Sequence, residues 1–232
     1  MINIHQASHL FHALATSPGI GQAVCNFMGW AGVRFCQDQV HHCSLRVRLL
    51  ACFLSRVESA GVDKTSLLRP LAFHRDSTYF DFVPKGEVCT VWVTLDDLQS
   101  DEGLSLGPLE YCVGSHLWGD GRRGSAGQFF DSNHRKLLFD AAAREGFLPD
   151  ERQFELVLAA AGGLSIHHGR CWHGSGPNSS TSRVRRGVGM HYIPSSARWP
   201  DSPVGKLWRD AAASSSADGS LCDQTFPLIW GS

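Results

Sequence analysis

The sequence lacks the features that mark secreted, membrane-spanning and nucleic-acid-binding proteins. Its formal net charge is only -1, from 21 basic and 22 acidic residues, so no global field recruits nucleic acid or an anionic membrane. No apolar run approaches the roughly 20 residues that span a bilayer, and no basic stretch followed by an apolar core opens the chain. These absences predict an intracellular, cytoplasmic protein without nucleic-acid or membrane partners, and they leave its oligomeric state open.

Paired cysteines are also missing. The eight cysteines include no C-x-x-C pair, and without a secretory signal we expect their thiols to be reduced and mostly buried. The length of 232 residues and the hydrophobic content of 43% suffice for one sizeable core. We therefore predict a single domain over residues 1–232.

What the sequence does contain is a helical beginning followed by many short strands. Residues 3–16 and 44–59 have helical spacing, and Gly19 with Gly21 marks the end of the first segment. From residue 70 onward, short apolar or alternating runs are separated by turn residues and interrupted by one helix, 134–145. This pattern predicts a mainly β sandwich or barrel with flanking helices. Residues 194–232 are predicted to form a loop-rich tail.

The stretch AFHRDSTYF places an imidazole and a carboxylate two residues apart. On a strand, His74 and Asp76 would share one face. A second histidine would complete a set of two histidines and one carboxylate, which leaves open positions on iron(II). His173, where a strand-like run breaks into a glycine-rich turn, is the best candidate. His167 and His168 compete for this role, and at most one of them can face the metal.

Zinc is the alternative metal for these ligand types. A zinc hydrolase would need a general base near the metal-bound water, and the sequence has no H-E-x-x-H helix. The metal-hydrolase alternative is therefore weakly supported.

Three arginines, Arg183, Arg185 and Arg186, follow His173 closely in the sequence. One of them could form a bidentate pair with the carboxylate of an organic co-substrate that itself chelates the metal. The competing interpretation is a solvated basic turn, because most charged residues are exposed.

The order H-x-D, W-H-G-S-G-P-N and R-R-G-V, with VWVTLDD and VGSHLWG between the metal motifs, resembles the phytanoyl-CoA dioxygenase family of iron(II)/2-oxoglutarate oxygenases. The resemblance runs from about residue 70 to 193. It implies a double-stranded β-helix, that is, a jelly-roll barrel, with iron held by His74, Asp76 and His173. It also implies a dioxygenase that uses O2 and 2-oxoglutarate, releases succinate and CO2, and hydroxylates a small organic substrate.

The resemblance also implies a binding site for 2-oxoglutarate. Trp92 corresponds to a tryptophan that lines this site, and Ser175 to the serine two residues after the distal histidine. Arg185 corresponds to the arginine that pairs with the distal carboxylate of 2-oxoglutarate. Arg183 is the second choice, because the spacing from His173 to Arg185 is one residue longer than expected. The presence of Asp76 favours hydroxylation over halogenation, since related halogenases lack this carboxylate.

Upstream of the H-x-D motif, the sequence departs from the family. Residues 41–68 have helical spacing and a basic character, and a lysine that reaches 2-oxoglutarate in the family cannot be placed, since Lys64 has no matching context. One hypothesis is that this stretch is an insertion or an artefact of how the gene was translated. A native insertion would remove a core strand, which makes a catalytically inactive relative that binds a metal or a partner the alternative function.

Overall fold

The computed structural model describes residues 3–43, 70–83, 86–119, 133–146, 148–150, 153–214, 216 and 218–231, with backbone alone for residues 41–43. The predicted helix 44–59, Lys64 and nearly all of the atypical stretch 41–68 lie outside the described residues. Only its first three residues, 41–43, are described, and they end a strand.

The described helices are short. They are η1 (Ile4–Gln6), α1 (His9–Ala15), α2 (Pro18–Met28), η4 (Asp76–Tyr79), α4 (Asp101–Leu104), η6 (Ser115–Leu117), α5 (Lys136–Arg144) and α6 (Arg209–Ala213). The predicted helix 134–145 is confirmed as α5, which ends just before Gly146, a residue with a positive φ of 86°.

The predicted helical segment 3–16 ends at Ala15, close to the predicted position, but Gly19 and Gly21 do not mark this end. The chain continues after α1 into α2, and Gly19 and Gly21 lie inside that second helix. Gly21 is needed there for close packing, because a Cβ atom at this position would lie 2.8 Å from the Cβ of Trp230. A glycine that serves helix packing therefore looked like a helix stop in the sequence.

The strands pair in a nested order. They are β1 (Gly32–Cys43), β2 (Leu71–His74), β3 (Cys89–Thr94), β4 (Leu109–Cys112), β5 (Phe154–Leu156), β6 (Leu164–His168), β7 (His173–Ser175), β8 (Arg185–Pro194) and β9 (Leu228–Gly231). β1 pairs with β8, β2 with β7, β3 with β6 and β4 with β5, always antiparallel. This nesting is that of a double-sheet jelly roll, so the predicted double-stranded β-helix is confirmed.

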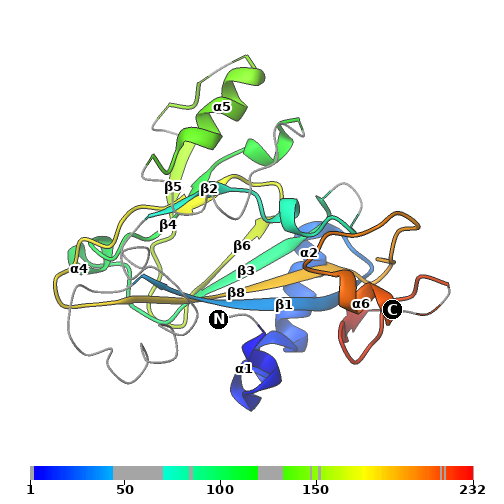
Figure 1. The fold of residues 1–232 in the computed structure, drawn as a ribbon. Helices are drawn as coiled ribbons and strands as arrows, with labels where there is room; N and C mark the ends of the chain where they lie inside the picture. The colour runs from blue at the N-terminus through cyan, green and yellow to red at the C-terminus, as the bar shows by residue number, and fades with distance from the viewer. Residues whose placement is uncertain are drawn as a thin grey trace, which may run out of the picture.

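Two sheets face each other and helices cover their outer faces. The larger sheet has the order β6-β3-β8-β1-β9, and the smaller sheet has the order β2-β7-β4-β5. α1 and α2 pack on the outer face of the larger sheet through Ala15 and Val24, and α5 packs on the smaller sheet through Leu138 (Figure 1). The fully buried Leu138 contributes on the order of 2 kcal/mol through its removal from water. The inner faces of the two sheets are left to line the barrel.

β1 is a strand that the sequence analysis did not predict. Val33 and Phe35 pack under the helices, but the register shifts between Phe35 and Gln37, and this bulge breaks the alternation of apolar residues. Val40 returns to the helix-covered face. β1 lies between β8 and β9 in the larger sheet. The expected loss of a core strand is therefore wrong, because the strand lies almost entirely before residue 41.

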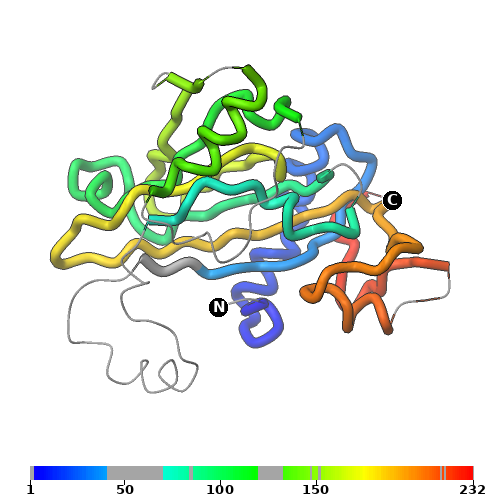
Figure 2. Tube along the Cα trace, turned by 45° about the horizontal axis from the view of Figure 1, so that its top comes forward, coloured from blue at the N-terminus to red at the C-terminus, as the bar shows by residue number. Residues whose placement is uncertain are grey.

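The residues after β8 close one end of the barrel. They are largely irregular, as predicted, but they also contain α6 and β9, and β9 pairs with β1. Trp199, Trp208 and Phe226 from this segment pack on Phe80 and Phe82, which follow the H-x-D motif. Figure 2 shows the segment in orange and red at the end of the barrel opposite to α4.

Two further observations concern the thiols and the helices. The six cysteines whose side chains are described are free thiols, and five of them are buried. No described helix combines the length and the apolar character that a membrane crossing requires.

Candidate metal centre

Two rows of side chains face each other inside the barrel. In the smaller sheet, His74 on β2 pairs with His173 on β7, and Tyr111 on β4 pairs with the same His173. Residues that are directly opposite on neighbouring strands point to the same face. The three rings therefore form one row across the sheet, and the ring centroids of His74 and His173 lie 4.3 Å apart.

The larger sheet contributes the facing row. Thr90 on β3 pairs with His191 on β8 and with His167 on β6. Gln37 on β1 extends the row as the partner of His191. The amide of Gln37, the hydroxyl of Thr90 and the imidazoles of His167 and His191 therefore face the histidines of the smaller sheet across the barrel interior.

Asp76 lies between the two rows, although not on a strand. β2 ends at His74, and Asp76 begins the short helix η4, so the prediction that both residues share one strand is wrong. Their side chains still converge because Arg75 between them keeps an extended conformation. The guanidinium of Arg75 points elsewhere, donates a hydrogen bond to the carbonyl of Gly119 and lies 5.1 Å from the ring centroid of Trp172.

The three predicted metal ligands come together. The Nε2 atoms of His74 and His173 each lie 3.6 Å from Oδ1 of Asp76, and the three ligand atoms lie within 4.8 Å of one another. Each imidazole donates its Nδ1–H to a backbone carbonyl two residues earlier, at 2.8 Å for His74 and 3.0 Å for His173. These bonds fix the tautomer that presents a lone pair on Nε2.

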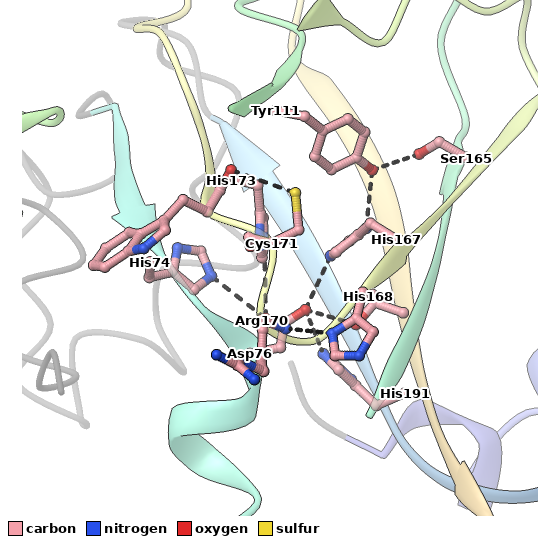
Figure 3. A network of polar contacts seen from close by, with 12 residues as sticks. His74, Asp76, Tyr111, Ser165, His167, His168, Arg170, Cys171, His173 and His191 are labelled. Atoms are coloured by element: carbon pink, nitrogen blue, oxygen red, sulfur yellow. Dashed lines mark hydrogen bonds and ion pairs between the residues drawn. The ribbon is translucent and has the colours of Figure 1, made fainter. Parts of the chain in front are cut away.

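The second carboxylate oxygen of Asp76 is held by other groups (Figure 3). Thr90 donates its hydroxyl to Oδ2 at 2.6 Å, and Nε2 of His167 lies 3.0 Å from the same oxygen. His168, the neighbouring candidate, faces away: its Nδ1 accepts a hydrogen bond from the backbone of Arg170. The structure thus places His173 beside Oδ1, His167 beside Oδ2 and His168 outside the cluster.

The cluster has the protonation state that a metal requires. Burial alone raises the pKa of the Asp76 carboxyl, but the nearby imidazoles, His173 first and then His167, His191 and His74, hold this pKa well below its ordinary value. Burial lowers the pKa of His173 and of His167, and it outweighs the opposing effect of Asp76. These directions favour an ionised Asp76 carboxylate beside neutral imidazoles of His173 and His167, and metal ligands must be deprotonated in this way.

The residues predicted to bind 2-oxoglutarate lie further along the interior. Trp92 faces inward on β3 and packs with Leu106 and Leu109. Its ring lies over Gly187, where a Cβ atom would come within 2.7 Å of the indole. Ser175 ends β7 and is buried, and no described residue forms a hydrogen bond with its hydroxyl.

The structure separates the three arginines. Arg185 begins β8, is 5% exposed and donates a hydrogen bond to the carbonyl of Gly107. Arg183 instead pairs with Glu102 at 3.2 Å in a half-exposed position, and Arg186 pairs with Asp96 on the outside. The solvated interpretation fits Arg183 and Arg186, while Arg185 is the buried cation.

Sequence reasoning missed Thr90, Tyr111 and His191. Thr90 precedes Trp92 by two residues on a strand, and this alternation is the signal that could have placed both on the inner face. Tyr111 and His191 lie on strands that only the fold brings to Asp76.

Comparisons with known proteins identify the family and the fold. The family model of phytanoyl-CoA dioxygenase (PhyH) matches residues 2–187. The chain belongs to the phytanoyl-CoA dioxygenase family. It is therefore an oxidoreductase of the iron(II)/2-oxoglutarate-dependent non-haem oxygenase type. The family match confirms the predicted resemblance and extends it toward the N-terminus, across β1.

Solved structures share the fold of this PhyH-family chain. The epimerase SnoN from nogalamycin biosynthesis, solved with Fe3+, alpha ketoglutarate and nogalamycin RO, is 22% identical with a TM-score of 0.65, over 99% of this chain and 77% of SnoN. The carbocyclase SnoK from the same biosynthesis is 20% identical with a TM-score of 0.69, over 99% and 74%.

A third structure is EctD from S. alaskensis with 2-oxoglutarate and 5-hydroxyectoine. It is 15% identical with a TM-score of 0.59, over 100% of this chain and 67% of EctD. At these identities the likeness shows the shared jelly roll. No curated protein sequence matches the chain.

Proposed function

We propose that this chain is a single-domain dioxygenase that hydroxylates a small organic substrate, with conversion of 2-oxoglutarate to succinate and CO2. His74, Asp76 and His173 would hold the iron. The observation that carries this proposal is the position of Oδ1 of Asp76, at 3.6 Å from each of two imidazole nitrogens whose tautomers are fixed for metal binding.

The donor set fits iron(II). Two neutral imidazoles and one carboxylate on one side of a metal leave the remaining coordination positions open, as in non-haem iron oxygenases. The buried hydroxyl of Ser175, which has no described partner, and the buried cation of Arg185 fit a carboxylate-bearing co-substrate. Iron(II), when bound, would supply the oxygen and electron-transfer chemistry that no side chain provides.

The residues of the chain would bind and orient. Nε2 of His74 and of His173 and Oδ1 of Asp76 would fix the metal. The guanidinium of Arg185 would pair with the distal carboxylate of 2-oxoglutarate, and Ser175 would donate a hydrogen bond to it. Trp92 would line the side of the 2-oxoglutarate site, and its apolar neighbours would keep water out of the reaction.

The alternative function, an inactive relative, depended on the loss of a core strand. β1 is present and joins β8 over ten paired positions, so that argument no longer applies. The substrate class is proposed as a small molecule, in keeping with the nogalamycin RO and 5-hydroxyectoine complexes of SnoN and EctD.

An anaerobic titration tests the proposal. Iron(II) and 2-oxoglutarate added to the purified protein should produce a weak visible charge-transfer band, because the open positions allow chelation. Asp76→Ala and His173→Ala should lose the band and succinate production while circular dichroism shows an intact fold. A folded wild-type protein without the band at saturating components would refute the proposed function.

A further inference from the structure

The two oxygens of Asp76 have different surroundings. Oδ1 faces the two imidazoles that would share the metal, while Oδ2 receives a hydrogen bond from Thr90 and one from His167. A carboxylate that is free to turn could offer both oxygens to a metal. Donors on Oδ2 occupy the lone pairs that such bidentate binding would need. The hydrogen bonds to Oδ2 therefore favour binding of a metal through Oδ1 alone.

The proton positions on His167 follow from its neighbours. Its ring is 4% exposed, and the Nε2 atom that faces the carboxylate oxygen must carry the hydrogen. In a neutral imidazole, Nδ1 is then an acceptor. The hydroxyl of Tyr111 lies 2.9 Å from Nδ1 and must donate to it. Tyr111 thus selects the tautomer of His167 that can bind Asp76.

The hydrogen-bond chain continues one residue further. Oγ of Ser165 lies 2.8 Å from the hydroxyl of Tyr111, and with the Tyr111 proton directed at His167, Ser165 donates to Tyr111. All donors in the chain then point toward Asp76. Figure 3 shows the contacts that link Ser165, Tyr111, His167 and Asp76. Tyr111 belongs to the smaller sheet, whereas Ser165 and His167 belong to β6 of the larger sheet. The chain therefore ties both sheets to one carboxylate oxygen.

We propose that His167, held in one tautomer by Tyr111, is a positioning residue that keeps Asp76 a monodentate metal ligand. This inference rests on the proposed function. Monodentate binding keeps one more coordination position open for 2-oxoglutarate or oxygen. Thr90 alone would leave the carboxylate free to rotate about its hydrogen bond, while a second donor on the same oxygen fixes its plane.

A role in packing alone is the competing explanation. The ring of His167 also contacts Tyr111 at 4.9 Å and His173 at 4.4 Å between centroids. Phenylalanine would keep most of this contact and would lose the N–H group. Glutamine would lose the ring and could keep an N–H donor near Oδ2. The two substitutions therefore separate shape from hydrogen bonding.

The test uses cobalt(II) as a metal probe, because its visible spectrum reports coordination number and geometry. We expect His167→Phe to alter the spectrum of the cobalt-loaded protein and to weaken 2-oxoglutarate binding to that form. Its affinity for cobalt should fall by roughly 10- to 100-fold, the usual effect of losing an outer partner of a metal ligand. His167→Gln should bring the cobalt spectrum and the affinity for 2-oxoglutarate back toward the wild-type values. Tyr111→Phe should give a smaller change of the same kind.

His168→Phe is the matched control. It makes the same chemical change on the adjacent residue of β6, whose side chain does not face Asp76, and it should leave the cobalt spectrum unchanged. Thermal unfolding of each variant separates loss of fold from loss of geometry, and Tyr111→Phe serves if His167→Phe does not fold.

Three results would overturn the inference. In the first, His167→Phe and His168→Phe give the same spectrum and the same affinity for 2-oxoglutarate. In the second, His167→Gln is as impaired as His167→Phe, which would assign the effect to the ring. In the third, wild-type protein binds no cobalt, which would refute the metal site of the proposed function as well.

Discussion

The two ends of the barrel interior are built in opposite ways. Around Asp76 the walls are polar, and imidazole and hydroxyl groups surround one carboxylate. Around Arg185 the interior is mostly apolar. The side chains packed there are Trp92, Leu98, Leu106, Leu109 and Val157.

The two ends differ in whether their polar groups have hydrogen-bond partners when no ligand is bound. Two hydrogen bonds to Oδ2 already hold the carboxylate of Asp76, so the metal end is preorganised by the protein alone. At the other end, the buried hydroxyl of Ser175 has no described partner, which costs free energy in the ligand-free protein. We interpret the first end as built for a metal and the second as built for a carboxylate that arrives with the co-substrate.

The largest effect that distinguishes the two ends is expected from Arg185→Gln. Charge-assisted hydrogen bonds to the carboxylate contribute about 1.5–3 kcal/mol, so the dissociation constant for 2-oxoglutarate should rise about 10- to 150-fold. Metal affinity should change little, because Arg185 does not contact the metal cluster. Titration of the charge-transfer band with 2-oxoglutarate measures the first quantity, and cobalt binding measures the second.

Arg186→Gln is the control for this experiment. Arg186 is the next residue on β8, but it pairs with Asp96 on the outside of the barrel. Its loss should leave the affinity for 2-oxoglutarate near the wild-type value. Equal losses in both variants would show that general charge, rather than a clamp by Arg185, attracts the co-substrate.

Ser175→Ala is expected to have two smaller effects of opposite sign, one on the stability of the protein and one on 2-oxoglutarate binding. Removing a buried hydroxyl without a partner should stabilise the ligand-free protein by up to about 1 kcal/mol, because the desolvation cost disappears. The same substitution should weaken 2-oxoglutarate binding about 2- to 10-fold, through the loss of one hydrogen bond. Thermal unfolding without ligand and band titration with ligand measure the two effects. A destabilised ligand-free variant would contradict the view that this end is incomplete.

The cluster of His74, Asp76 and His173 could be predicted from the sequence because local features mark these three residues. The H-x-D spacing holds His74 and Asp76 together, and a glycine-rich turn marks His173. Even there, the prediction of a continuous strand was wrong, since β2 ends at His74. The side chains converge because the intervening residue keeps an extended backbone.

The partners of Asp76 could not be predicted in the same way. Thr90 and His167 meet because β3 and β6 pair in one particular register, and a register depends on the whole sheet rather than on local spacing. β1 escaped prediction for a related reason. Its bulge after Phe35 and its polar inner side interrupt the apolar alternation by which strands are recognised.

The smallest effect is expected from His168, which follows His167 on β6 but faces away from the metal end. Burial, with help from His116 and Arg170, lowers the pKa of His168 from 6.5 to about 4. Between these pH values the unfolded chain binds a proton that the folded chain does not, so the free energy of unfolding falls as the pH drops from 6.5 toward 4. His168→Gln should remove this part of the pH dependence.

Urea unfolding of the metal-free protein at pH 7.5 and pH 5 measures the effect. The loss of stability between the two values should be smaller in His168→Gln than in wild type, and only modestly so, because the ring is half-buried and solvent screens it. The cobalt spectrum should stay unchanged at pH 7.5. An altered spectrum would place His168 inside the metal end and would break the separation between the two faces of β6.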